Sequence, residues 1–346
     1  MSFKKKICVI GGGVIGVTSA LAVKEKFPNF NVTIFADNYT PNTTGDGSAG
    51  FWDPYLIQDT PDVDILRWGG ATHKWMENFW KTDLSSEIGV SLIPVFRVSN
   101  DVESKEMPSW LSLVYAGRNL THQELRKFND DYCKKYRSGY SFLTYTCEPK
   151  YLLPYLMDKF KSLGGIVVKR KINNFNELAD EGYEILINCA GINAGKLSGD
   201  STVEPIRGQV ARVKAPWIFG VFLDDNNYII PNMESVILGG TSQVNDYDTK
   251  VRKIDSKFIK EGCQKIIPAI GNAKLIDEWV GLRPGRKSIR LESEILVNKT
   301  GKKYTVIHNY GHGGSGVTLC WGCALDVVKI LQNFFIQKVY FITSNL

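Results

Sequence analysis

The stretch KKKICVIGGGVIGVTSALAV, residues 4–23, decides the fold of this chain. Residues 7–10 form a short, continuous apolar run, the pattern of a parallel strand that is buried on both faces. Gly11, Gly13 and Gly16 follow this run with the spacing G-x-G-x-x-G. Such glycines allow a sharp turn, close approach of the backbone to a pyrophosphate, and tight packing of a helix on the strand. The stretch therefore predicts a strand, a turn and a helix that bind a dinucleotide.

A second strand pattern supports this interpretation. Residues 31–35 are apolar and β-branched, and Asp37 lies about twenty residues beyond the glycines, where an acid accepts a hydrogen bond from a ribose hydroxyl. The opening residues also resemble a secretory signal, with three lysines, an apolar run and Ala20-Leu21-Ala22. The glycine spacing and Asp37 favour a dinucleotide site over a cleaved signal or a glycine-rich turn without a ligand.

The bulk composition is that of an ordinary globular protein. With 346 residues, 43% hydrophobic and 23% charged, the chain should form one large or two medium domains. No run of 18 apolar residues occurs, so no membrane-spanning helix is expected. The net charge of +6 is dispersed, which predicts no nucleic-acid partner. Seven scattered cysteines, including the pair Cys320 and Cys323 in a helical pattern, favour buried thiols in a reducing compartment over disulfides or a metal site.

Strand and helix patterns divide the chain into two kinds of material. Dinucleotide-type pieces occur at residues 7–37 and 151–191, and a glycine-rich turn at 310–316 precedes a helical pattern at 317–332. Two glycine-rich helix starts suit FAD better than NAD alone. The segment 205–245 carries short strand patterns instead. We predict an α/β fold, a Rossmann-like FAD-binding domain with an inserted mixed or antiparallel β-sheet substrate domain. The predicted boundaries are 1–45, 140–200 and 281–346 for the FAD-binding domain, and 46–139 and 201–280 for the substrate domain.

Seven motifs resemble one family of enzymes. They are GGGVIG at 11–16, ADNYTPNTT at 36–44, NCAGINAG at 188–195, PIRGQV at 205–210, YIIPN at 228–232, VGLRPGRKSIRLE at 280–292 and HNYGHGGSGVTLCWGCAL at 308–325. In this order they resemble the D-amino-acid oxidase and D-aspartate oxidase family of flavoenzymes, over nearly the whole chain. The resemblance implies non-covalent FAD and the oxidation of D-amino acids by O₂ to 2-oxo acids, ammonia and H₂O₂. D-aspartate oxidase, acting on D-Asp and D-Glu, is the alternative. An NAD-dependent dehydrogenase and a flavin-binding protein without turnover are the rival classes.

The resemblance also implies the site residues. Arg283 matches the arginine that binds the substrate carboxylate, Tyr228 a tyrosine whose hydroxyl also holds it, and Gly314 the turn whose carbonyl holds the substrate amine. Asp53 and Tyr55, in the segment FWDPYL, are expected at the side-chain pocket. The residues expected to contact FAD are Gly11, Gly13, Val14, Ile15, Gly16, Ala36, Asp37, Thr43, Thr44, Ser48, Ala49, Gly50, Ile172, Cys189, Ala190, Gly191, Gly313, Gly314, Ser315, Gly316, Val317 and Thr318.

The side-chain preference depends on positions that depart from the family pattern. Ser242 follows LGGT where the D-aspartate branch usually carries an arginine, and Asp224 stands where the neutral branch carries a second tyrosine. Arg207 and Arg212 are candidates to replace the missing arginine. An ionised Asp53 facing the substrate would repel D-Asp and favour D-Arg or D-Lys, which we state as a hypothesis. His308 and His312 are expected to be structural hydrogen-bonding residues.

The chain ends in Ser344-Asn345-Leu346, which resembles the peroxisomal signal S-K-L. An oxidase that releases H₂O₂ suits a peroxisome, so we expect the peroxisomal import receptor as a partner. The usual lysine is absent, and a weak signal would leave the protein in the cytoplasm. A homodimer is a further candidate state.

Overall fold

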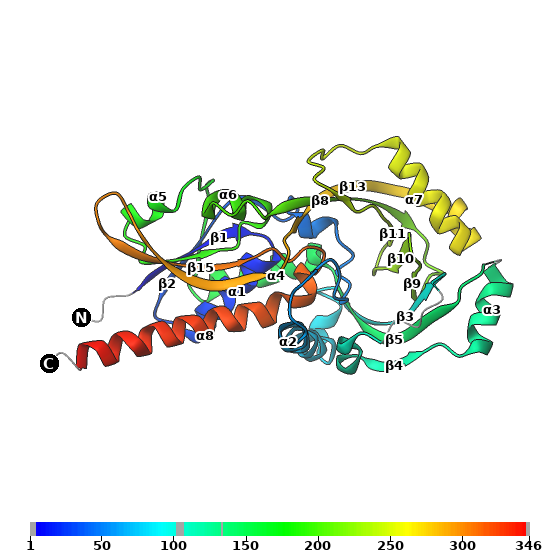
Figure 1. Cartoon of the computed structure of the whole chain (residues 1–346), viewed down its shortest axis with the longest axis horizontal. Helices are drawn as coiled ribbons and strands as arrows, with labels where there is room; N and C mark the ends of the chain where they lie inside the picture. Colours follow the sequence, from blue (N-terminus) through cyan, green and yellow to red (C-terminus); the bar gives the residue numbers. More distant parts are fainter. Residues whose placement is uncertain (1–4, 102–106, 133, 344–346) are drawn as a thin grey trace.

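The computed structural model describes residues 5–101, 107–132 and 134–343 (Figure 1). Within these residues the strands form one six-stranded and one nine-stranded sheet, which lie side by side on the left and the right of Figure 1. The predicted α/β class with a second, mixed sheet is therefore confirmed. The tripeptide 344–346 and Cys133 lie outside the described residues.

The six-stranded sheet has the order β14-β15-β7-β1-β2-β6 and is parallel except for the β14–β15 pair. Its strands are β1 (Lys6–Gly12), β2 (Asn31–Tyr39), β6 (Ile166–Lys169), β7 (Ile185–Asn188), β14 (Arg290–Val297) and β15 (Lys303–Tyr310). The accompanying helices are α1 (Val14–Lys26), α4 (Pro149–Ser162), α5 (Phe175–Asp180), α6 (Ala194–Ser198) and α8 (Gly316–Thr343).

The first strand and helix pack as the opening stretch predicts. Residues 7–9 are fully buried because β1 lies between β2 and β7 in the centre of the sheet. Gly11 has φ +128°, and a Cβ there would lie 2.2 Å from the carbonyl oxygen of Cys189 on the neighbouring crossover. A Cβ on Gly16 would lie 2.0 Å from the oxygen of Gly11. Only glycine therefore lets the turn bend and α1 lie directly against the end of β1.

The nine-stranded sheet has the order β12-β8-β11-β10-β9-β3-β5-β4, with β13 paired to β8. In Figure 1 it curves, with β8 and β13 along its upper side and β3, β5 and β4 along its lower side. Residues 140–147 lie in this sheet within β5, whereas the boundaries predicted from the sequence place them in the FAD-binding domain. The strands are β3 (Val90–Ser99), β4 (Tyr115–Asn119), β5 (Ser138–Cys147), β8 (Glu204–Lys214), β9 (Val221–Leu223), β10 (Tyr228–Pro231), β11 (Val236–Gly239), β12 (Gln243–Val244) and β13 (Lys274–Gly285).

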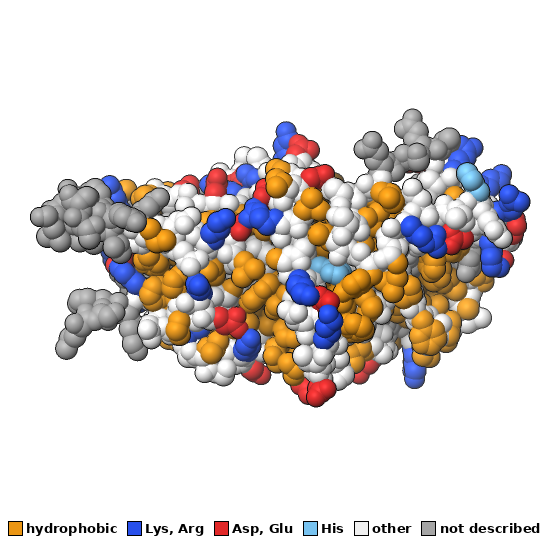
Figure 2. All heavy atoms as spheres, turned by 90° about the horizontal axis from the view of Figure 1, so that it is seen from below, with side chains coloured by type: hydrophobic (Ala, Val, Ile, Leu, Met, Phe, Trp, Pro, Cys, Tyr) orange, Lys and Arg blue, Asp and Glu red, His pale blue; other side chains and the backbone are white. Residues whose placement is uncertain are grey.

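Three further helices, α2 (Asp62–Trp80), α3 (His122–Tyr132) and α7 (Lys253–Ile266), accompany this sheet. Helix α2 packs against α8, so it joins the two halves of the molecule. A Cβ on Gly322 of α8 would lie 2.2 Å from the carbonyl oxygen of Trp68 on α2, which shows how closely the two backbones approach. On the face drawn in Figure 2, apolar, basic and acidic side chains are interspersed.

Helix α8 is apolar along much of its length. Its segment Gly316–Ile336 is the one stretch among the described residues that is long and apolar enough to cross a membrane, although Asp326 and Lys329 interrupt it. Cys320 and Cys323 on this helix are fully buried and unpaired, and α8 packs against α1 and α2. This is the arrangement of a core helix, and it places both thiols in the hydrophobic core as predicted.

Candidate active site

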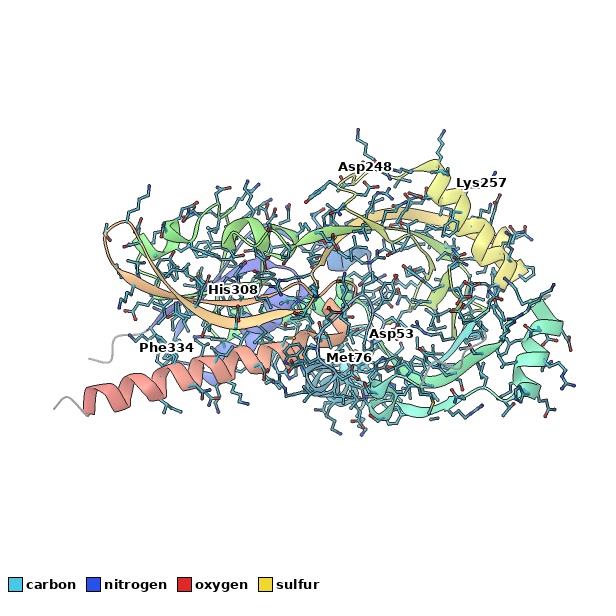
Figure 3. The ribbon with its side chains drawn as sticks, in the orientation of Figure 1. Asp53, Met76, Asp248, Lys257, His308 and Phe334 are labelled. Carbon is cyan, nitrogen blue, oxygen red and sulfur yellow. The ribbon has the colours of Figure 1, made fainter. Side chains whose placement is uncertain are left out.

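A cavity of about 1050 Å³ is lined by residues from both sheets. One part is lined by the turn after β1 and the end of β2, and another by Tyr55, Tyr228 and Arg283. Figure 3 labels Asp53, which also lines the cavity, near the middle of the molecule. The volume lies at the upper end of the usual range for small-molecule sites, about 300–1,000 Å³, so it has room for a large cofactor and a small substrate together.

Most of the residues expected to contact FAD line this cavity. Gly16, Ser315 and Thr318 do not. Gly16 packs beneath Gly11, as described above. The others line it: Gly11, Gly13, Val14, Ile15, Ala36, Asp37, Thr43, Thr44, Ser48, Ala49, Gly50, Ile172, Cys189, Ala190, Gly191, Gly313, Gly314, Gly316 and Val317.

Ser315 and Thr318, at the start of α8, hold the segment 53–55. The Ser315 hydroxyl accepts a hydrogen bond from the Tyr55 N–H at 2.7 Å and donates to the Tyr55 carbonyl at 2.9 Å. The Thr318 hydroxyl accepts from the Asp53 N–H at 3.2 Å. These two residues therefore position the Asp53–Tyr55 segment instead of contacting the cavity.

The cavity fits a dinucleotide cofactor on two counts. Gly13 lines the cavity at the start of α1, and a Cβ there would meet a single atom within 4 Å, Cβ of Thr43 at 3.9 Å, so its backbone is not crowded by the protein. Trp279 Nε1, Asn309 Oδ1 and His312 Nε2 are buried without a hydrogen-bond partner, and all three residues line the cavity. A buried polar group left unsatisfied costs about 1–3 kcal/mol. Burial also lowers the pKa of His312 to about 3, so its imidazole is neutral near neutral pH. These polar atoms suit a ligand rich in donors and acceptors, such as FAD.

Arg283 lines the cavity together with Tyr55 and Tyr228. Its Nη1 donates to the Thr241 carbonyl at 3.0 Å, and its Cζ lies 6.0 Å from the centre of the Tyr55 ring. Within the described part of the chain, no acidic side chain lies within the 4.0 Å limit of an ion pair with this guanidinium. The half-buried positive charge of Arg283 is therefore available to an anion in the cavity.

Glycines make room for the side chains of Arg283 and Tyr228. The guanidinium of Arg283 lies over Gly208, where a Cβ would be 2.3 Å from Nη1. The ring of Tyr228 lies over Gly239, where a Cβ would be 1.9 Å from Cζ. Burial raises the pKa of the Tyr228 phenol, and Arg283 partly opposes this shift. The Tyr228 hydroxyl therefore stays protonated and can donate a hydrogen bond to the same anion.

The glycine-rich turn before α8 packs against the segment around Tyr55. The Gly314 N–H donates to the Tyr55 carbonyl at 3.2 Å, and a Cβ on Gly314 would lie 2.4 Å from Cδ1 of Tyr55. Gly313 has φ +53°, and a Cβ there would lie 1.8 Å from the Leu56 oxygen. The close packing brings Gly314 and Tyr55 together on the cavity wall.

Arg97 is a cavity residue that the sequence analysis missed. Its Nη2 lies 2.5 Å from Oδ2 of Asp53, and the two form an ion pair. The hypothesis that Asp53 repels D-Asp assumed an unpaired carboxylate, but the structure pairs that carboxylate with a guanidinium. The available signal was a single arginine within the mainly apolar strand VSLIPVFRVS.

The other positions considered for side-chain selectivity do not supply an arginine to the cavity. Arg207 is fully buried and does not line it, since its guanidinium is bound by Gln243, Asp255 and other groups. Arg212 pairs with Asp277 and also lies outside the lining. Asp224 lines the cavity, but its carboxylate accepts hydrogen bonds from neighbouring backbone N–H groups. Ser242 is not a lining residue.

His308 lies away from the cavity within the six-stranded sheet (Figure 3). Its Nε2 lies 2.8 Å from Oε1 of Glu294 on β14. Burial lowers the pKa of His308, and Glu294 opposes this shift. Its contacts agree with the structural role expected from the sequence.

This arrangement is that of a cofactor-dependent enzyme, with room for a dinucleotide and a small anion in one cavity. The family model described as "FAD dependent oxidoreductase" matches residues 6–330. The chain therefore belongs to the family of FAD-dependent oxidoreductases, and FAD is its cofactor.

Curated relatives match along almost the whole chain. A D-amino acid oxidase of Dugesia ryukyuensis is 40% identical over 335 residues, which cover 96% of this chain and 98% of the relative. A D-aspartate oxidase of Homo sapiens is 34% identical over 330 residues, 95% of each chain. Among solved structures, the glycine oxidase of Geobacillus kaustophilus superposes with a TM-score of 0.75 at 16% identity, over 95% of each chain, and shows the shared fold.

Proposed function

We propose that this enzyme oxidises D-amino acids to 2-oxo acids, with O₂ as the final electron acceptor. The observation that carries the proposal is the guanidinium of Arg283, which has no acidic partner among the described residues and lines the same cavity as the glycine-rich turn after β1. The similarity to proteins named D-amino acid oxidase and D-aspartate oxidase supports it.

The proposed substrate is held at both ends of its α-amino-acid group. The guanidinium of Arg283 forms a bidentate fork with the α-carboxylate, and the Tyr228 hydroxyl donates a further hydrogen bond. The carbonyl of Gly314 accepts a hydrogen bond from the amine. Because both groups are fixed, the Cα–H bond of one enantiomer is directed at the cofactor, and that of the other is not.

The reaction balances without a catalytic acid or base on the protein. When bound, FAD would supply the acceptor for the hydride of Cα, and O₂ would take up the two electrons to give H₂O₂. The substrate ammonium group first loses one proton to water, so that its nitrogen can form the C=N bond as the hydride leaves. Water then hydrolyses the imino acid to a 2-oxo acid and ammonia. The chain contributes the orientation of the substrate.

Paired enantiomers test this function. The purified protein, saturated with FAD, is supplied with D- and L-Ala, D- and L-Asp, and D- and L-Arg, and H₂O₂ is measured. We expect H₂O₂ with at least one D-amino acid and none with its L-enantiomer. H₂O₂ from L-enantiomers alone, or from none of the six, would overturn the proposal.

We further propose that Ser344-Asn345-Leu346 directs the enzyme to peroxisomes through the import receptor. The support is the resemblance of this tripeptide to S-K-L and the release of H₂O₂ in the proposed reaction. A fluorescent fusion that keeps this C-terminus should enter peroxisomes, and deletion of the tripeptide should leave the fusion in the cytoplasm. An unchanged distribution after deletion would contradict this proposal.

We also propose a homodimer. The loop between β8 and β9 exposes two large apolar side chains, with Trp217 48% and Phe219 79% exposed, which suits a contact with a second copy. Sedimentation of the full chain should give twice its mass of 38.8 kDa. A monomeric mass at micromolar concentration would contradict it.

A further inference from the structure

The ion pair of Asp53 and Arg97 lies on the cavity wall, and its two members are exposed to different degrees. The Asp53 side chain is 6% exposed, whereas the Arg97 side chain is 30% exposed. Asp53 is held from behind by Thr318 at the start of α8, while Arg97 projects from β3. Both residues line the cavity, and the guanidinium is the more exposed member of the pair.

Arg97 keeps free donors although it is paired. The Nη2 of Arg97 donates a hydrogen bond to Asp53, and the Nε of Arg97 is buried without a hydrogen-bond partner. The Cζ of Arg97 lies 5.8 Å from the centre of the Tyr140 ring, which supports the plane of the guanidinium. Burial opposes the charge, but Asp53, Tyr140 and Tyr55 raise the pKa of Arg97 overall, so it stays protonated. A carboxylate in the cavity could accept from Nη1, for which no hydrogen bond occurs within the described residues.

Tyr55 interacts with both guanidinium groups. Its ring centre is 6.0 Å from Cζ of Arg283, and it is also among the groups that interact electrostatically with Arg97. Arg97 on β3 and Arg283 on β13 line the same cavity as Tyr55. A molecule with two carboxylates can contact both.

We infer that Arg97 binds the side-chain carboxylate of the substrate, so that the enzyme prefers acidic D-amino acids, D-Asp and D-Glu. This inference rests on the proposed function, in which Arg283 holds the α-carboxylate. Asp53 competes with the substrate for Arg97 and thereby weakens, but does not abolish, this contact. The basic side chain of D-Arg or D-Lys fits less well. Its acidic partner would be Asp53, which is buried and already paired with the guanidinium of Arg97.

D-Asp and D-Asn differ only in the charge of the side chain, so the ratio of their kcat/KM values isolates this contact. In the wild type, D-Asp should exceed D-Asn. Arg97→Gln should lower the ratio by about 30-fold or more, the loss typical of a removed partner in a desolvated charge pair. Asp53→Asn should raise kcat/KM for D-Asp, by at least about tenfold, because a competing carboxylate is removed. The opposite signs exclude a merely structural role for the pair.

Two controls keep the test decisive. Asp53→Asn/Arg97→Gln removes both charges together and avoids a buried, unpaired carboxylate, and it should still lose the preference for D-Asp. Arg137 also lines the cavity but is exposed, and it lies just before the start of β5. Arg137→Gln removes the same charge and should leave the ratio unchanged. A wild-type preference for D-Asn or D-Arg, or an unchanged ratio in the double variant, would overturn the inference.

Binding of succinate and butyrate separates this inference from the proposed reaction. Succinate carries the two carboxylates of D-Asp without the reactive amine, and butyrate carries one. By calorimetry on the FAD-loaded enzyme, succinate should bind more tightly than butyrate, and Arg97→Gln should remove the difference. If the difference depends on Arg97 but no D-amino acid is oxidised, the inference stands and the proposed function fails. Equal binding of both acids to the wild type would overturn the inference.

Discussion

The cofactor part of the cavity and the substrate part are built in different ways. Around the turn after β1, the chain contributes mainly backbone, and glycines allow a strand, a turn and a helix to approach closely. Around Arg283, the chain contributes side chains from β3, β10 and β13, and glycines serve only to make room for them. The first part depends on a contiguous stretch of sequence, whereas the second depends on how distant strands are paired.

The largest expected effect comes from adding a single methyl group to the cofactor part. Gly11→Ala would place a Cβ 2.2 Å from the Cys189 oxygen at φ +128°. Backbone strain and overpacking together should cost about 2–6 kcal/mol of unfolding free energy, and FAD should no longer bind. Denaturant unfolding and flavin absorbance measure the two effects.

Gly182→Ala is the matched control for this substitution. Gly182 has φ +90°, but a Cβ there would meet nothing within 4 Å, so its variant measures backbone strain alone. It should be destabilised less than Gly11→Ala and should bind FAD normally. If Gly11→Ala were no less stable than Gly182→Ala and kept FAD, the close approach at the turn would not matter.

In the substrate part, the largest effect should come from Arg283→Leu. Loss of the partner of a desolvated carboxylate costs about 2–5 kcal/mol, or about 30-fold to several thousand-fold in kcat/KM for a D-amino acid. FAD binding should persist, because we propose that Arg283 holds the substrate and not the cofactor. Steady-state kinetics and flavin absorbance are the measurements. Arg118→Leu, which removes an exposed arginine that pairs with Glu124 on the surface, should leave both unchanged. Equal kinetics in the two variants would remove Arg283 from the site.

The same contrast explains what could be predicted from the sequence. Gly11, Gly13 and Gly16 lie within six residues of one another, and their spacing alone indicates a turn against which a helix packs. Arg283 was placed by its resemblance to a family motif, since no local pattern identifies a carboxylate-binding arginine. Arg97 was missed because its partner Asp53 is 44 residues away, on a segment held by α8.

The role of Asp53 could not be predicted for the same physical reason. From the sequence it is an acid near the substrate, and its effect depends on whether another charge neutralises it. Arg97 is brought to it by the pairing of β3 with β5 and β9, a register that a single sequence does not determine. The charge that the substrate meets is therefore a property of the folded sheet.

The pH dependence of stability concerns two buried histidines, one that lines the cavity and one on α2 outside it. Burial lowers the pKa of His312, at the cofactor turn, to about 3, and that of His73, on α2 near Tyr145 of the second sheet, to about 4. Both values lie below the unfolded value of about 6.5, so the unfolded chain binds more protons below that pH. The contribution of each histidine to the free energy of unfolding should be fully present above about pH 6.5. As the pH drops towards 4, the free energy of unfolding should fall by up to about 1.4 kcal/mol per pH unit for each histidine.

His73→Phe should remove one of these contributions and flatten the fall between pH 6.5 and 4. A phenylalanine ring suits this site, because the His73 ring already packs against Trp52 and Tyr145. The Nε2 atom of His73 has no hydrogen-bond partner that the substitution would remove. Urea unfolding at several pH values, compared with the wild type, measures the slope. An identical slope in both proteins would contradict a neutral, buried His73.

The smallest effect should come from Tyr228→Phe. The ring would keep its place over Gly239, and only the hydroxyl that donates to the substrate carboxylate would be lost. One hydrogen bond to a charged group is worth about 1.5 kcal/mol, so kcat/KM should fall about tenfold. A loss as large as that of Arg283→Leu, or no loss, would show that the hydroxyl has another role.

The most direct test of the central claim is a crystal structure of the FAD-loaded enzyme with a D-amino acid, prepared without O₂. The account predicts that the α-carboxylate lies in the fork of Arg283, within hydrogen-bond distance of the Tyr228 hydroxyl, with Cα facing the flavin. An amino acid bound elsewhere in the cavity, with the guanidinium of Arg283 turned away from it, would contradict the account.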